Sequence, residues 1–176
     1  MKHSVIELTV CAALSAILCV VCPFTVPVGV VPLSLASFAV CCIGGAAGFK
    51  RGTAATALYI LIGGVGVPVF AGFRGGLSVL LGPTGGFLLG YLLLVATAGF
   101  AADRTDSKCT FCASLCGGML LLYLCGSAWY SVSAHVSFWA ALLVCVVPFL
   151  PLDIVKIAAA TALSPKLKKA LRSMKT

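Results

Sequence analysis

The sequence predicts an all-α integral membrane protein, a single domain over residues 1–176 built as a bundle of six transmembrane helices. Of its 176 residues, 61% are hydrophobic and only 9% are charged, and the mean hydropathy is +1.18. A soluble domain of this size could not bury so much apolar surface. The apolar residues fall into six long runs, and nearly all basic residues fall on one side of these runs. Together these observations favour a multi-pass protein of the cytoplasmic membrane.

The first three runs lie in the N-terminal part of the chain. Residues 5–22 form the first predicted span, and residues 23–32 contain three prolines, which favours a short extended loop over a helix. Residues 33–49 and 53–67 form the second and third spans, joined at Lys50-Arg51-Gly52. Both are near the lower length limit for crossing a hydrocarbon core of about 30 Å.

A glycine-rich segment follows the third span. Ten glycines lie between Gly63 and Gly90, and Arg74 is in the middle of the segment. Glycine allows positive φ and close approach to a ligand, whereas irregular backbone at membrane depth is tolerated only where it lines a cavity. We therefore expect this segment to line one.

The last three runs complete the predicted bundle. The fourth span covers about residues 82–101, a polar turn follows at 103–108, and the fifth span covers 109–128. We expect residues 129–150 to connect the spans at the membrane interface, with a short helix near 136–147 and Trp129, Tyr130 and Trp139 as interfacial aromatics. The sixth span then covers 151–170.

The distribution of basic residues orients these spans. With the N-terminus inside, ten Lys and Arg residues lie on the cytoplasmic side, and Arg74 is the one on the outer side. The reverse orientation contradicts the positive-inside rule, so both termini are predicted to be cytoplasmic. The formal net charge of +8 therefore indicates membrane loops and not a nucleic-acid partner.

Asp153 and Lys156 are ionisable residues within an apolar segment. Such groups are costly in the membrane and are normally paired, turned inward and functional. Their i, i+3 spacing places them on one helix face, and Pro151 suits a first helical turn, where the helix dipole favours an anion such as Asp153. The pair is either a polar anchor for a ligand or a structural clamp between helices.

The candidate pocket charges define the kind of ligand. Arg74, Asp153 and Lys156 sum to +1, so a ligand with one carboxylate would neutralise them. The remaining wall would be apolar and aromatic, which favours a small amphipathic monoacid. Catalytic constellations and a Walker A motif are absent from the sequence. We therefore predict no enzyme activity and no cofactor, and energy for uphill transport would come from a partner or an ion gradient.

Two motifs carry a resemblance to a known family. The segments 63–72, 75–77 and 81–87, the last reading Leu-Gly-Pro-Thr-Gly-Gly-Phe, resemble the signature of BioY biotin transport proteins. Pro148-Phe149 followed by Asp153-Ile154-Val155-Lys156 resembles that family's second motif, with Leu152 at the position where the family usually has glycine.

The resemblance implies a substrate-binding S component of an energy-coupling factor transporter, with biotin as substrate near the outer face. Its implied partners are a membrane coupling subunit and cytoplasmic ATPase subunits, and Ala12-x-x-x-Ala16 resembles the docking surface. The alternative is an uncoupled small-molecule carrier or a structural membrane protein. The candidate substrate-binding residues are Asp153, Lys156, Arg74, Tyr59, Phe70, Gly82, Thr84 and Gly85.

Overall fold

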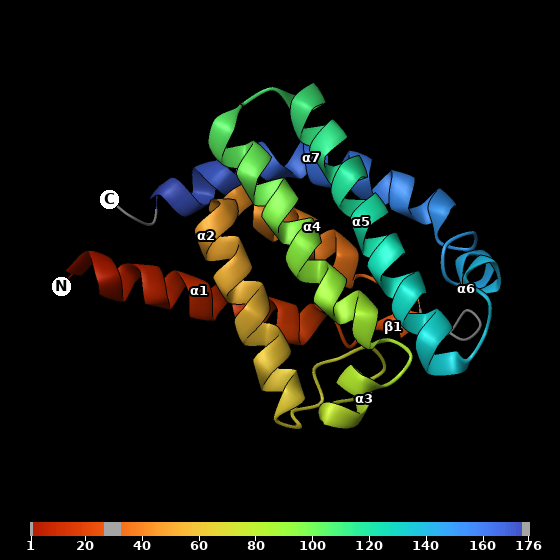
Figure 1. Ribbon diagram of the computed structural model, residues 1–176. Coiled ribbons are helices and arrows are strands. Elements are labelled where there is room, and N and C mark those ends of the chain that lie inside the picture. The colour runs from red at the N-terminus through yellow and green to blue at the C-terminus, as the bar shows by residue number, and fades with distance from the viewer. Residues whose placement is uncertain (1, 27–32, 174–176) are drawn as a thin grey trace.

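Helices dominate the computed structural model, which describes residues 2–26 and 33–173. The expected all-α architecture is confirmed, with one short antiparallel strand pair among the described residues. Residues 27–32 of the predicted proline-rich loop lie outside the described part. The elements in chain order are α1 (Lys2–Val21), β1 (Thr25–Val26), β2 (Leu33–Ser34), α2 (Ala36–Gly64), α3 (Leu77–Leu81), α4 (Gly85–Arg104), α5 (Lys108–Ala134), α6 (Phe138–Cys145) and α7 (Leu150–Ser173) (Figure 1).

The predicted second and third spans form one broken helix. The break in α2 is at Gly48, whose φ of 78° and ψ of −176° leave the helical region, and not at Lys50-Arg51-Gly52. A Cβ atom at Gly48 would lie 2.2 Å from Asp103 Oδ1. Asp103 Oδ2 accepts a hydrogen bond of 2.8 Å from the Phe49 N–H, so a carboxylate from α4 caps the second part of α2.

Small residues bring α2, α4 and α5 close together. A Cβ atom at Gly44 would lie 2.7 Å from the Cβ of Ala98 on α4, and one at Gly90 would lie 2.7 Å from Leu122 on α5. Gly86 packs against Trp129 in the same way. The spacing Gly44-x-x-x-Gly48 thus places two small residues against α4. These three helices form the centre of the bundle.

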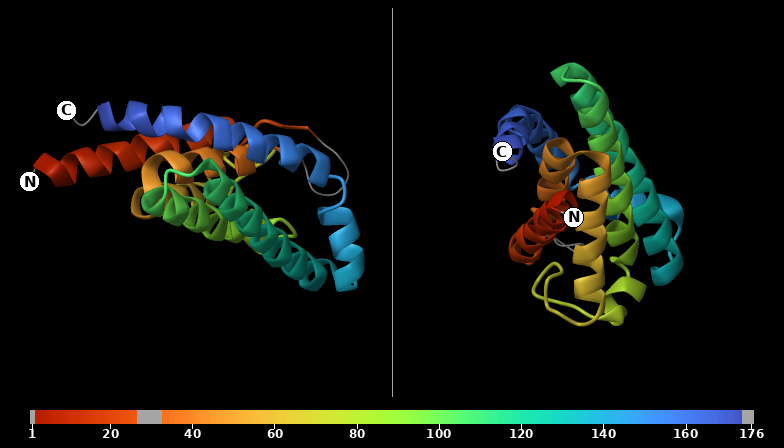
Figure 2. Two further views of the ribbon diagram at one scale, coloured as in Figure 1. Left: turned by 90° about the horizontal axis from the view of Figure 1, so that it is seen from above. Right: turned by 90° about the vertical axis from the view of Figure 1, so that its left-hand side faces the viewer.

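The two termini lie at one end of the molecule, and α1 and α7 lie along the outside of α2 (Figure 2). The loops expected on the outer side meet at the other end. There, the Gly72 N–H donates to the Pro23 carbonyl at 3.0 Å, and the rings of Phe24 and Phe73 are 5.5 Å apart. Trp129 Nε1 donates to the Gly82 carbonyl at 2.9 Å. These three loops therefore lie together at the end of the molecule away from the termini.

The connection between the last two long helices is more helical than expected. Helix α5 continues to Ala134 and ends at His135, which has a left-handed backbone. Tyr130 is therefore a buried residue of α5, where it packs with Ala141, Cys145 and Phe149, and not an interfacial residue of the connection. The predicted short helix is present as α6, and Trp139 on it is 76% exposed. Helix α7 starts at Leu150, one residue before the predicted span.

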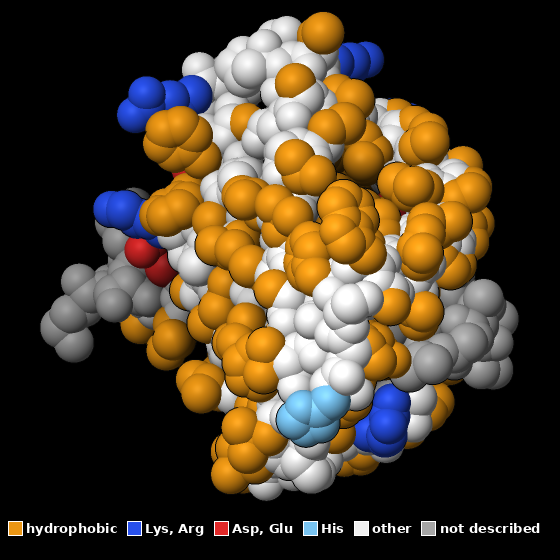
Figure 3. Space-filling view, turned by 45° about the vertical axis from the view of Figure 1, so that its right-hand side comes forward, with side chains coloured by type: hydrophobic (Ala, Val, Ile, Leu, Met, Phe, Trp, Pro, Cys, Tyr) orange, Lys and Arg blue, Asp and Glu red, His pale blue; other side chains and the backbone are white. Residues whose placement is uncertain are grey.

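Much of the molecular surface is hydrophobic. In Figure 3 one face is largely covered by apolar side chains, whereas Lys and Arg side chains lie at its margins. Among the described residues, α4 and α5 are long and apolar enough to cross a membrane, and α6 with α7, bent by 59°, would make a third crossing. Neither part of α2 reaches the length of a full crossing, because Gly48 divides it.

The capping contact at the break in α2 predicts a stability effect. Replacement Asp103→Ala leaves the Phe49 N–H without its acceptor and should lower the free energy of unfolding by about 0.5–2 kcal/mol. Thermal unfolding of the purified protein in detergent would measure the loss. Asp103→Asn, which keeps a carbonyl acceptor, is the control and should lose less. Equal stability of Asp103→Ala and the wild type would show that the cap does not stabilise the break.

Candidate functional site

A pocket lies at the end of the bundle where the loops meet. Its space, counted together with the open mouth, amounts to about 690 Å³. The start of α2, the glycine-rich segment, α4, α5, α6 and the first turns of α7 all contribute to its wall. The described lining residues are Ser34, Ser37, Phe70, Ala71, Arg74, Val79, Thr84, Phe87, Leu88, Tyr91, Leu122, Tyr123, Cys145, Phe149, Asp153 and Lys156.

The predicted pair of charged residues lies in this wall. Lys156 Nζ is 2.8 Å from Asp153 Oδ1, and the two residues are only 9% and 6% exposed. Asp153 lies in the first turn of α7, as Pro151 led us to expect. The buried stripe of α7 continues through Ala160 and Ser164, so the pair faces the bundle and not the lipid.

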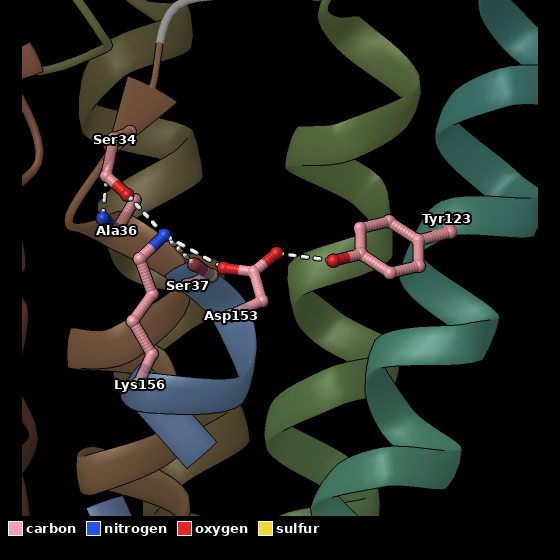
Figure 4. A network of polar contacts seen from close by, with 6 residues as sticks. All are labelled: Ser34, Ala36, Ser37, Tyr123, Asp153 and Lys156. Atoms are coloured by element: carbon pink, nitrogen blue, oxygen red, sulfur yellow. Dashed lines mark hydrogen bonds and ion pairs between the residues drawn. The ribbon is translucent and has the colours of Figure 1, made fainter. Parts of the chain in front are cut away.

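Lys156 is held by the start of α2. Its Nζ donates to the Ser34 carbonyl at 2.9 Å and to Ser37 Oγ at 3.1 Å. The Ser34 hydroxyl also accepts a hydrogen bond of 2.9 Å from the Ala36 N–H, which fixes the turn from β2 into α2. Figure 4 shows these groups around the ammonium. With Asp153, the three donors of Lys156 all have partners.

Asp153 is held from the opposite side by α5. The Tyr123 hydroxyl donates to Asp153 Oδ2, whereas Oδ1 faces Lys156. Tyr123 is itself buried. The network therefore joins α2, α7 and α5 across the base of the pocket (Figure 4).

Three further predicted residues line the same pocket. Phe70 is fully buried, and its backbone N–H donates to the Arg74 carbonyl at 2.8 Å, which closes a tight turn. Arg74 lies in that turn and is exposed, so its guanidinium stands at the mouth and not at the base. Thr84 precedes α4 and contributes to the wall.

The other predicted residues lie behind the wall. Tyr59 is buried, its hydroxyl donates to the Val69 carbonyl at 3.3 Å, and its ring packs edge-on against Phe70 at 5.6 Å. Gly82 accepts the hydrogen bond from Trp129. A Cβ atom at Gly85 would lie 1.8 Å from the Leu80 carbonyl oxygen. All three are outside the set of described lining residues and support the loop that carries Phe70 and Thr84.

Sequence reasoning missed Tyr123, Tyr91, Ser34 and Ser37 as lining residues. A signal was present, because the chain has neither Asn nor Gln and only four tyrosines. Polar contacts within the membrane must therefore come from hydroxyl groups and backbone. Which hydroxyl groups face the pocket depends on the rotation of α5 and α4, which sequence periodicity does not determine.

The fold and this site define a membrane-embedded binding protein. An apolar pocket at one end of a helix bundle carries a small set of convergent charged and hydroxyl groups, which is the pattern of a site for a small amphipathic ligand.

The chain belongs to the BioY family, whose sequence profile matches residues 1–173. The biotin transporter BioY of Thermotoga maritima is 37% identical over 145 residues, covering 82% of this chain and 85% of that protein. The probable biotin transporter BioY of Pyrococcus horikoshii is 36% identical over 162 residues, covering 92% of this chain and 96% of that protein. The family assignment expected from the glycine-rich motif is confirmed, and the family is one of membrane transporters, not enzymes.

The fold is also similar to a solved structure. The crystal structure of the S-component for biotin from an ECF-type ABC transporter superposes with a TM-score of 0.86. The match covers 96% of this chain and 93% of that chain, at 24% sequence identity. At this identity the likeness establishes the fold.

Proposed function

We propose that this protein binds biotin with high affinity and takes it up across the cytoplasmic membrane as the substrate-specific subunit of an energy-coupling factor transporter. The observation that carries the proposal is the buried Asp153–Lys156 pair in the wall of an apolar pocket. Membership of a family whose relatives are named biotin transporters supports the choice of ligand.

The hydrogen-bond inventory of the site suggests how biotin lies. Lys156 already has three partners, so it positions Asp153 and has no donor left for a ligand. An ionised carboxylate has about four lone-pair sites, of which Tyr123 and Lys156 occupy two. Asp153 can therefore accept both ureido N–H groups of biotin.

The remaining groups of biotin fit other parts of the wall. Ser37 accepts from Lys156 and can donate its own proton to the ureido carbonyl. The hydrocarbon tail would lie against Phe70 and Phe87, and Arg74 at the mouth would pair with the carboxylate. In this arrangement the single negative charge of biotin neutralises the net charge of +1 on the three ionisable residues.

A structural role for the same pair is the second candidate. The network links α7 to α2 through Lys156 and to α5 through Tyr123, which is what a helix clamp in a carrier or a structural membrane protein would do. The two roles differ in one respect, because only a binding residue changes ligand affinity when the protein stays folded.

Replacement Asp153→Asn separates these roles. It preserves shape but removes a charge-assisted acceptor contributing about 1.5–3 kcal/mol, so biotin affinity should fall about 10- to 150-fold. Equilibrium binding of labelled biotin to the purified protein would measure this. Asp106→Asn, the same change at the opposite end of the molecule, is the control and should bind like the wild type. A folded Asp153→Asn protein with unchanged affinity would leave the pair as a clamp.

The proposed topology has six membrane crossings and two cytoplasmic termini. The crossings are α1, α4, α5 and α7, together with the two parts of α2, each shorter than a usual crossing and therefore dependent on local thinning of the bilayer. Helices α3 and α6 lie at the outer end. The basic residues support this orientation, since Arg51 and Lys168 lie at the end that carries the termini and pair there with Glu7 and Asp106. The biotin pocket then opens to the outside.

Thiol labelling of intact cells tests the orientation. Cys109 is exposed at the start of α5 and should react with a membrane-impermeant maleimide only after permeabilisation. In a background where the other cysteines are alanine, Val65→Cys, at a position 87% exposed beyond the end of α2, should react in intact cells. Labelling of Cys109 in intact cells would reverse the proposed orientation.

Helix α1 is the proposed contact with the membrane coupling subunit, through which cytoplasmic ATPase subunits would drive uptake. Leu14, Ser15 and Leu18 form the buried face of α1, whereas Ala12 and Ala16 are exposed. The small-residue face is thus available for close packing with a partner helix.

The double replacement Ala12→Leu/Ala16→Leu tests this contact. Bulky side chains should hold a partner helix away and reduce biotin uptake by about tenfold or more, as expected for the loss of about 1.4 kcal/mol. Biotin binding by the purified subunit should be unchanged. Val20→Ala, which alters an exposed position on the same helix without adding bulk, is the control. Normal uptake by the double variant would show that this face contacts lipid.

A further inference from the structure

A second pocket lies at the opposite end of the bundle, between the α4–α5 turn and the last turns of α7. Its space amounts to about 760 Å³, including the open mouth. Lys108, Lys168 and Lys169 line it, together with Asp106, Ser107 and the buried ring of Phe111. We call it the basic pocket. It shares no lining residue with the pocket around Asp153.

The charges of the basic pocket favour an anion. Three ammonium groups face one carboxylate, and only Lys168 is paired with it, at 2.9 Å. Lys168 also donates to the Ala102 carbonyl at 2.7 Å, so two of its three donors are used. Within the described residues, Lys108 and Lys169 form no ion pair. The pocket therefore keeps a net charge of about +2 that its own residues do not neutralise.

The start of α5 adds backbone donors to this charge. Ser107 is the N-cap residue, but no side chain caps the helix, and its first turn contains no acidic residue. The break in α2 lies in the same part of the molecule and is capped by the carboxylate of Asp103. The first turn of α5 therefore starts at the wall of the basic pocket with backbone N–H groups that the Ser107 side chain does not cap.

The surroundings of the basic pocket indicate where the anion comes from. The pocket lies at the ends of α4 and α5, the two helices that are long and apolar enough to cross a membrane. This depth is that of lipid headgroups. Phe111 gives the pocket an apolar wall, and exposed aliphatic residues such as Leu163 on α7 continue toward the membrane interior. Basic pockets between transmembrane helices bind anionic lipid headgroups by this combination.

We propose that the basic pocket binds a phosphate group, supplied by an anionic phospholipid of the surrounding membrane. Lys108 and Lys169 neutralise the phosphate, the free donor of Lys168 and the N–H groups of α5 bind its oxygens, and the acyl chains lie beside α7. Inorganic phosphate has the same binding chemistry without the chains. The proposal is independent of biotin binding.

Native mass spectrometry of the full chain in detergent tests this site. Phosphatidylglycerol, phosphatidylcholine and inorganic phosphate are the three probes. Phosphatidylglycerol should be retained and phosphatidylcholine, which has no net charge, should not. The variant Lys108→Gln/Lys169→Gln should retain phosphatidylglycerol roughly 30-fold more weakly, because two basic groups near an anionic headgroup are lost.

The matched control removes two charges at the same end but outside the pocket. Lys50 and Lys166 are exposed and do not line it, so Lys50→Gln/Lys166→Gln should retain phosphatidylglycerol as the wild type does. Unchanged biotin binding would show that both variants are folded. Displacement of the lipid by millimolar inorganic phosphate would show that the phosphate group is sufficient, whereas retention would show that the acyl chains are also needed.

Two results would overturn the proposal. Equal retention of phosphatidylglycerol and phosphatidylcholine by the wild type would mean that the pocket does not select an anion. An equal loss in the pocket variant and in the control variant would mean that the lipid responds to the overall positive charge of this end and not to a site.

Discussion

The buried pair Asp153–Lys156 is the interaction on which the architecture around the site depends. Two opposite charges within an apolar helix are stable only when both are turned inward and fully hydrogen-bonded. Here Lys156 donates to the Ser34 carbonyl and the Ser37 hydroxyl, and Asp153 accepts from the Tyr123 hydroxyl. The two serines lie at the start of α2 and Tyr123 lies on α5, so satisfying one pair sets the position of α7 against both α2 and α5.

The centre of the bundle makes these partners available. Close contacts at Gly44 and Gly90 bring α2, α4 and α5 together and leave α7 on the outside, where it covers the gap between α2 and α5. Both parts of α2 pack on α4, at Gly44 and Gly52, and Gly45 of the first part also packs against Ser164 on α7. The pocket is thus the space left at one end, where the glycine-rich segment covers the bundle with turns and not with a continuous helix.

The sequence predicted the features that depend only on residues close together in the chain. Asp153 and Lys156 are conspicuous because charge is rare in apolar runs, and the glycine-rich segment is conspicuous because so many glycines favour turns and close backbone approach. Tyr123 and Ser37 were not predictable in this way, since their roles depend on the rotation of α5 and α2 about their axes. Gly82 and Gly85 were predicted near the ligand from the motif. They lie behind the wall, where the Gly82 carbonyl accepts from Trp129 and the Leu80 carbonyl occupies the space that a Cβ atom at Gly85 would need.

A clamp and a binding site need not exclude one another in this structure. The pair is satisfied without a ligand, so a bound molecule must add hydrogen bonds to those already present and not replace them. Lys156 has no donor left, whereas an ionised carboxylate at Asp153 has lone pairs beyond those used by Tyr123 and Lys156. Because a ligand with two N–H groups can use these lone pairs without breaking the link to Tyr123 or Lys156, binding would tighten the contact between α7 and the bundle. The same residues would then couple ligand binding to the packing of α2, α5 and α7 against one another.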